Sequence, residues 1–201
     1  MIKTLLVTGV AVAAAGANAA LIIEPTPGNL PDTEIVLFND PGLLEMGPVV
    51  EGILNQSRAI VEFRDAGEDL FTAAEGQARI EAVDGSFTAL TTRMSDPSLG
   101  IAAYQFNINA IEDGSVEISL YEAGSVTLTE SFAVKAAGEN WFRIYGTDGE
   151  VMSQVSFSSS AEILDVRQNR IGAAPAPVPE PASIAALGIG LAMLLRRRTR
   201  K

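Results

Sequence analysis

The strongest constraint on the fold is a series of short apolar runs, each ended by a turn. About ten such runs lie between residues 34 and 172 at a spacing of about 8 to 12 residues, with no long helical pattern among them. Residues 77–83 and 103–111 alternate polar and apolar side chains with period two. This pattern predicts one all-β domain over residues 34–172, an antiparallel β-sandwich of jelly-roll-like type.

The same pattern predicts strand pairing and a core. The runs 103–111 and 116–122 flank Glu112-Asp113-Gly114, and a D-G turn between two alternating runs predicts a β-hairpin. Residues 20–33 contain three prolines and are expected to form an extended lead-in. The inward-facing positions predict a core that includes Val61, Phe63, Ile80, Phe87, Tyr104, Phe106, Ile108, Ile118, Phe142, Ile144, Val155 and Phe157.

Residues 1–19 have the three regions of a secretory signal peptide. Lys3 supplies one positive charge, residues 4–16 are apolar or small, and Ala17-Asn18-Ala19 is an A-x-A cleavage pattern. Cleavage is therefore expected after Ala19, with the Sec export machinery and signal peptidase as partners. The alternative is an N-terminal anchor that is not cleaved.

The C-terminal end contains a second uncharged run, residues 182–195, behind a proline-rich linker at 173–181. Fourteen helical residues rise about 21 Å, which is short of a hydrocarbon core of about 30 Å. Long basic side chains can reach the headgroups, and they keep their end of a span in the cytoplasm. We therefore expect a short transmembrane helix with the domain outside the cytoplasm, rather than a buried core helix or a free lipid-binding tail. The basic stop comprises Arg196, Arg197, Arg198, Arg200 and Lys201 in the tail 196–201.

The C-terminal residues resemble a known sorting signal. Val178-Pro179-Glu180-Pro181, the short apolar run and the terminal arginines closely resemble the PEP-CTERM sorting domain. The resemblance implies a bacterial cell envelope and an exosortase-type enzyme that processes the tail near Pro179, Glu180 and Pro181. It implies a precursor anchored in the inner membrane and a product at the cell surface or outside the cell. More loosely, the segments 76–87, 104–110 and 141–168 resemble the β-rich domain of many exported PEP-CTERM proteins, which has no assigned chemistry.

Composition excludes several function classes. The chain has no histidine and no cysteine, so a Ser-His-Asp triad, a cysteine nucleophile and an ordinary zinc site are excluded. Its net charge is −11, and loss of both ends would leave about 24 acidic and 8 basic side chains, near −16. Such a charge opposes binding to nucleic acid and to anionic polymers, and favours solubility and divalent cations. We expect a protein that is not an enzyme.

Two kinds of site stay open. Asp40, Glu45, Asp65, Glu68 and Asp69 lie in turn-rich segments and could hold a structural calcium ion, or they could simply cap turns and face water. No other cofactor is expected. Trp141, Arg143 and Tyr145 share one face of a strand and could stack on sugar rings, or they could cover a sheet edge.

The leading hypothesis is therefore an exported, C-terminally sorted surface or extracellular-matrix protein that is not an enzyme. The first alternative is a carbohydrate-binding module of the exopolysaccharide layer. The second alternative is a glycoside hydrolase that uses two carboxylates about 5 to 10 Å apart.

Overall fold

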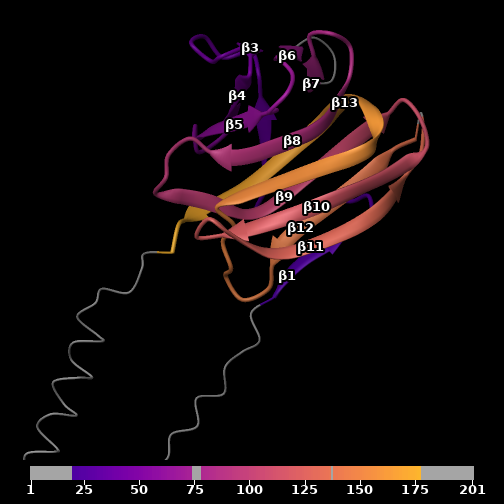
Figure 1. The fold of residues 1–201 in the computed structure, drawn as a ribbon. Helices are drawn as coiled ribbons and strands as arrows, with labels where there is room; N and C mark the ends of the chain where they lie inside the picture. The colour runs from indigo at the N-terminus through magenta and orange to yellow at the C-terminus, as the bar shows by residue number, and fades with distance from the viewer. Residues whose placement is uncertain (1–19, 74–77, 137, 178–201) are drawn as a thin grey trace, which may run out of the picture.

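The computed structural model describes residues 20–73, 78–136 and 138–177, which form an all-β domain (Figure 1). In this part of the chain there is no helix of the length and apolarity needed to cross a membrane. The strands are β1 (Leu21–Glu24), β2 (Glu34–Leu37), β3 (Met46–Gly47), β4 (Val49–Leu54), β5 (Ile60–Arg64), β6 (Leu70–Ala73), β7 (Arg79–Ala82), β8 (Phe87–Met94), β9 (Leu99–Ala110), β10 (Gly114–Glu122), β11 (Ser125–Val134), β12 (Asn140–Gly146) and β13 (Gln154–Pro175).

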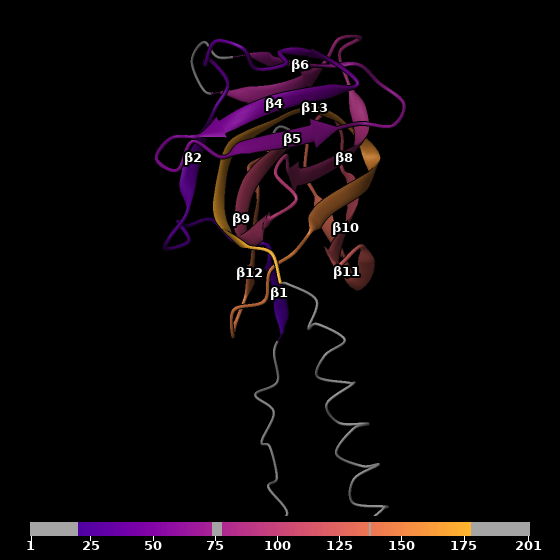
Figure 2. The same cartoon turned by 90° about the vertical axis from the view of Figure 1, so that its left-hand side faces the viewer.

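The strands pack in two layers, and β13 takes part in both. Residues 154–159 of β13 lie between β10 and β8 in the front layer, which continues through β11 on one side and β5 and β4 on the other. Residues 163–175 pair with β9 in the back layer, which continues through β12 to β1. Figure 2 shows β13 curving from one layer to the other. The named strand pairs are antiparallel, and the predicted antiparallel β-sandwich is confirmed.

Aromatic side chains fill the space between the layers. Phe106 of β9 stacks on Phe157 of β13 with ring centroids 6.1 Å apart, and Phe142 of β12 meets Phe132 of β11 at 5.5 Å. All twelve residues predicted for the core are buried. Removing these rings from water is the main stabilisation of a domain that has no disulfide.

The predicted hairpin across Glu112-Asp113-Gly114 is wrong. β9 pairs with β12 and β13, whereas β10 pairs with β11 and β13, so the segment between them carries the chain from the back layer to the front. Asp113 accepts hydrogen bonds from Lys135 Nζ at 2.7 Å and from the Ala136 amide at 2.9 Å. These bonds hold the pKa of the Asp113 carboxyl below its usual range, and they tie the crossing to the end of β11.

The actual hairpin joins β10 to β11 across Ala123 and Gly124, where Glu122 faces Ser125. Both central residues have positive φ, 47° and 82°, as a two-residue type I′ turn requires. Alanine seldom adopts positive φ, so this turn has a weak sequence signal.

Part of the predicted lead-in belongs to the sheet, and the chain turns at Pro31 and Asp32, where Asp32 has φ 57°. Residues 21–24 form β1 and pair with β12 at the edge of the back layer. Residues 25–33, which we call the strap, then cross the outer face of that layer. The Leu30 side chain is buried there, and its amide donates to Gln105 Oε1 at 3.2 Å.

The predicted signal peptide (Ala17 and Ala19), most of the sorting motif (residues 178–181), the apolar run 182–195 and the basic stop lie outside the described residues. At the other border of the domain, β13 continues to Pro175, and the Ala176 amide donates to the Ser98 carbonyl at 2.8 Å.

Candidate functional site

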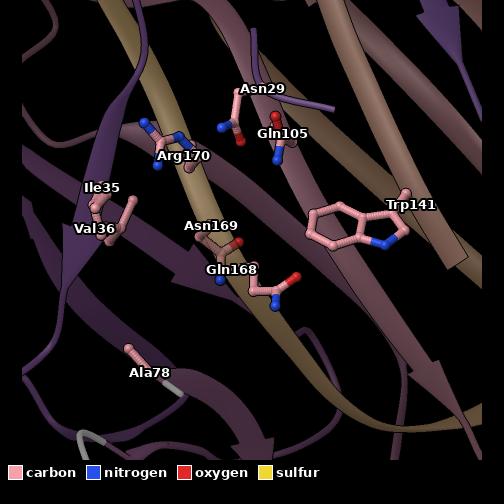
Figure 3. Close-up of a pocket in the computed structure, with 9 residues that line it drawn as sticks. All are labelled: Asn29, Ile35, Val36, Ala78, Gln105, Trp141, Gln168, Asn169 and Arg170. Carbon is pink, nitrogen blue, oxygen red and sulfur yellow. The ribbon is translucent and has the colours of Figure 1, made fainter. Parts of the chain in front are cut away.

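A cavity of about 330 Å³ lies beside the strap on the outer face of the back layer (Figure 3). Trp141 and Arg170 line it, together with an apolar wall from Ile35, Val36 and Ala78. We call it the Trp141 cavity. Its size is at the lower end of the range of small-molecule sites in proteins. Its remaining lining residues are the amide side chains Asn29, Gln105, Gln168 and Asn169.

Trp141 comes from β12, where Phe142 and Ile144 point into the core and Trp141 is half-buried on the outside. Its Nε1 donates to Glu139 Oε2 at 3.1 Å, which fixes the orientation of the indole. In Figure 3 the six-membered ring extends toward the cavity, with Gln105 on one side and Gln168 on the other. A hydrogen-bonded indole with a ring directed at a cavity can stack on an apolar face of a ligand.

A β-bulge in β13 supplies Gln168 and Asn169. Arg167 faces Asn107 and Arg170 faces Gln105, so β13 has one more residue than β9 between these two pairs. Gln168 has φ 57°, and the irregularity leaves Gln168 half-buried beside the cavity while Asn169 is buried. Asn169 Oδ1 accepts from the Tyr104 hydroxyl at 2.8 Å. Burial raises the pKa of that phenol, so it stays a neutral donor.

The β9 side chains on this outer face are polar but buried. Gln105 is 2% exposed and holds the strap through Leu30. Asn107, the next outward residue, is fully buried, and neither its amide nitrogen nor its amide oxygen has a hydrogen-bond partner within the described ranges. Unsatisfied buried amides are rare in folded proteins, so the outer face of β9 has been kept polar at a cost in stability.

Arg170 differs from most of the basic side chains. Six of the basic residues in the described ranges form ion pairs with carboxylates; they are Arg58, Arg79, Arg93, Lys135, Arg143 and Arg167. Arg170 and Arg64 form none there. Arg64 is exposed, whereas Arg170 is half-buried in the cavity wall. Arg170 donates only long hydrogen bonds, from Nε to Thr33 Oγ1 at 3.4 Å and from Nη2 to the Thr33 carbonyl at 3.5 Å.

The predicted row of Trp141, Arg143 and Tyr145 is present on one face of β12, but it is divided. Trp141 lines the cavity, whereas Arg143 and Tyr145 line a second hollow of about 470 Å³ beneath the strap. Arg143 Nη2 lies 3.6 Å from Glu24 Oε2, and the Tyr145 hydroxyl donates to Glu24 Oε1 at 3.0 Å. That hydrogen bond raises the pKa of Tyr145. Arg143 and Tyr145 therefore both interact with Glu24 of β1.

The sequence indicated Trp141 but missed the amides around it. The relevant signal was the polar pair Gln168-Asn169, which interrupts the apolar alternation between Val166 and Ile171 and marks the bulge. The sequence around Asn29 and Gln105 has no comparable feature. These two residues come close to each other only because the strap crosses β9.

Two of the acidic residues considered for calcium already have partners within the domain. Asp65 Oδ1 accepts from the amides of Gly67 at 2.7 Å and Glu68 at 3.2 Å, and Asp40 pairs with Arg58. Within the described ranges no three acidic side chains are grouped closely enough to hold a metal ion. Calcium binding stays a prediction.

Glu68 and Asp84 form the one acidic arrangement that bears on the hydrolase alternative. With Asp69 they line an open hollow of about 370 Å³, which we call the acidic hollow. The charge of Asp84 raises the pKa of Glu68, with smaller contributions from burial, a hydrogen bond to Asp84 and the charges of Asp65 and Asp69. Two carboxyls within hydrogen-bonding reach are closer than the pairs that hydrolyse glycosidic bonds.

Comparison with solved structures finds carbohydrate-binding modules. A family 29 module from Piromyces equi has 8% identity and a TM-score of 0.29, covering 84% of this chain and 99% of that one. A family 11 module from Clostridium thermocellum, in complex with a β-1,3-1,4-mixed-linked tetrasaccharide, has 13% identity and a TM-score of 0.30, covering 69% and 95%. TM-scores this low do not carry function to this chain.

No curated protein matches the chain in sequence. The C-terminal end does match a known family: residues 177–201 fit the PEP-CTERM protein-sorting motif. This chain is therefore a protein with a PEP-CTERM sorting motif directly behind a β-sandwich domain.

Proposed function

We propose that the chain is an exported surface or extracellular-matrix protein that is sorted through its C-terminal end and processed by an exosortase-type enzyme. Its β domain is not an enzyme. The observation that carries the proposal is the sorting motif at residues 177–201. The Sec machinery and signal peptidase would act first, at Ala17 and Ala19, to place the domain outside the cytoplasm.

The borders of the folded domain support this proposal. The described part of the chain begins at Ala20, directly behind the predicted cleavage site, where the Ala20 amide donates to Thr147 Oγ1 at 3.3 Å. It ends at Pro177, where the sorting motif begins. Both borders lie at the same end of the sandwich (Figures 1 and 2).

Chain length then limits where the domain stands in the precursor. Five residues separate the hydrogen-bonded Ala176 from the apolar run at Ala182. Six extended steps span at most about 20 Å. The precursor would hold this end of the sandwich close to the outer surface of the inner membrane until processing releases it.

The test is the intact mass of the protein from its native host, measured for each cell fraction. We expect a surface or released species that begins near Ala20 and ends between Val178 and Pro181. A Glu180→Ala variant should accumulate in the inner membrane with Arg196 to Lys201 still attached. A wild-type protein that keeps those basic residues in every fraction would refute processing.

A second candidate function is glycan binding at the Trp141 cavity. The observation that favours it is an indole ring beside four amide side chains in a cavity whose described lining has no acidic residue, in a domain with a large excess of acidic residues. An aromatic ring stacks on the apolar face of a sugar, while amides both donate to and accept from hydroxyl groups. The partner would be the exopolysaccharide around the cell.

Retention on the host exopolysaccharide tests this candidate. Trp141→Ala should abolish retention and leave the melting temperature nearly unchanged, because the ring lies outside the core. Tyr121→Ala is the matched control, since it removes a half-buried aromatic ring of β10 that does not line the cavity. Equal retention of the wild type and Trp141→Ala would refute the candidate.

A further inference from the structure

We propose that the Trp141 cavity binds a carboxylated sugar, a uronic acid residue of an oligosaccharide, with the sugar carboxylate on Arg170. The proposal deepens the glycan-binding candidate and rests on it. It adds a charge requirement that neither the sorting motif nor the aromatic ring supplies.

The first support is that Arg170 has no carboxylate partner in the described part of the chain, although acidic side chains are abundant. Six other basic side chains there have found one. A half-buried guanidinium with no counter-ion is costly to keep, whereas a ligand carboxylate would satisfy it with short, charge-assisted hydrogen bonds. The cavity thus holds a cation that the protein itself leaves unneutralised.

The second support is that Arg170 is positioned rather than free. Its backbone pairs with Gln105 directly behind the bulge, and Nε and Nη2 rest on Thr33 of the strap. The only hydrogen bonds of its side chain in the described ranges are these two, so Nη1 keeps its donors for a ligand. Figure 3 shows the guanidinium at one side of the cavity and Trp141 across from it.

The third support is that the described lining of the cavity contains no acid. Among the residues that the structure describes, the lining includes four amides, one indole and one guanidinium, and no aspartate or glutamate. The charged side chain in this described lining is Arg170, whereas the nearby Glu139 carboxylate lies outside the lining and accepts from Trp141 Nε1. A sugar ring between Arg170 and Trp141 would have its hydroxyls within reach of Asn29 and Gln105.

The charge near −16 that would remain after loss of both ends limits how densely charged a ligand can be. A long polyanion would be repelled by the whole domain, whereas a single carboxylate on a short or sparsely charged chain is governed by the nearest charges. At physiological salt, fields from charges more than about 8 Å away are largely screened. The site is therefore suited to isolated uronic acid residues, not to a densely charged polymer.

Fluorescence of Trp141 reports on the cavity directly, because it is the only tryptophan in the chain. The full-length chain, in a detergent without a sugar headgroup at physiological salt, is titrated with trisaccharides of galacturonic, glucuronic and mannuronic acid. Each acid is compared with its methyl ester, which has the same ring and no charge. We expect at least one acid to change the emission and to bind about tenfold or more tightly than its ester.

Three variants assign the difference to Arg170. Arg170→Gln should reduce acid affinity about tenfold and ester affinity less than threefold, and Arg170→Lys should keep part of the preference for the acid. Arg64→Gln is the matched control, because it removes the other basic side chain without a carboxylate partner among the described residues, away from the cavity. It should change neither affinity. Melting curves check that each variant is folded.

The outcomes separate this inference from the candidate on which it rests. If the ester binds as well as the acid, or better, the carboxylate requirement is wrong and glycan binding stands. If the wild type binds neither the acids, the esters nor the host exopolysaccharide, both fail. If Arg170→Gln folds and keeps the full preference for the acid, the assignment to Arg170 is wrong.

Discussion

The Trp141 cavity and the acidic hollow are two concave regions of one acidic domain, and they have opposite chemistry. The cavity is built mainly on β9, β12 and β13, and Arg170 is the only charged residue in the part of its lining that the structure describes. The acidic hollow is built on turns, and Glu68, Asp69 and Asp84 repel one another in it. The domain has about three acidic residues for each basic one, yet the described lining of the Trp141 cavity contains no acidic residue.

The difference shows where a candidate site should be sought in such a domain. In the acidic hollow the charges are exposed and water screens them, so repulsion costs little and needs no functional explanation. Beside the cavity the Asn107 side chain of β9 is fully buried, and neither of its amide atoms has a hydrogen-bond partner among the described residues. That arrangement costs stability, and costs of this kind gather at functional sites.

The largest effect is expected at the floor of the cavity. Phe106 lies on the inner side of β9, behind Gln105 and Asn107, and contacts Tyr104, Phe142 and Phe157. Phe106→Ala should lower the free energy of unfolding by about 3 to 5 kcal/mol, because it opens a void among packed rings. Val83→Ala, in the wall of the acidic hollow, should change it by less than about 0.5 kcal/mol because Val83 is exposed. Denaturant unfolding measures both free energies. Equal losses of stability would contradict the contrast between a cavity backed by the core and a hollow walled by exposed side chains.

A smaller effect is expected where the strap meets the cavity. Gln105→Ala removes the acceptor of the Leu30 amide and should cost about 1 to 3 kcal/mol, because a buried N–H loses its partner. Hydrogen exchange at the Leu30 amide should accelerate with it. Gln154→Ala, at the start of β13, is the control and should leave that amide protected. Unchanged exchange in Gln105→Ala would mean that the strap is held by other contacts.

The smallest effect is expected in the acidic hollow, and it depends on pH. The pKa of Glu68 is raised in the folded state, so the folded protein binds this proton more readily than the unfolded chain does. The associated stability is present at low pH and is lost as the pH rises through the raised pKa of the folded state. Glu68→Gln should therefore gain melting temperature relative to the wild type as the pH rises from about 4 to 7. Glu117→Gln is the control because the Glu117 side chain is exposed on β10, and an equal gain there would point to net charge alone.

Two turns show how far local sequence can predict pairing. Asp113-Gly114 has the stronger hairpin signal, yet it joins two layers, because β9 and β10 each already have partners on both sides. Ala123-Gly124 has the weaker signal and forms the hairpin. The pairing of β9 and β10 with other strands outweighed the turn preference. Both strands bury most of their apolar side chains, which requires a partner strand on each side.

The candidate site was predicted in part for a similar reason. Period two correctly placed Trp141, Arg143 and Tyr145 on one face of β12. It could not show that Glu24 would engage Arg143 and Tyr145 while Trp141 faced amides from three other segments. Which side chains share a hollow depends on contacts between residues far apart in the chain, such as Leu30 and Gln105.

By itself the sequence determined the parts that depend on near neighbours. The sorting motif is a continuous stretch of residues, and the fold class and the core follow from alternation, because successive side chains of a strand point to opposite faces. Only the tertiary structure decided that β13 would serve both layers and that its bulge would turn Gln168 and Arg170 toward Trp141. Both features depend on which strands pair over long sequence distances. We expect the pairing that buries the aromatic core most completely to have the lowest free energy.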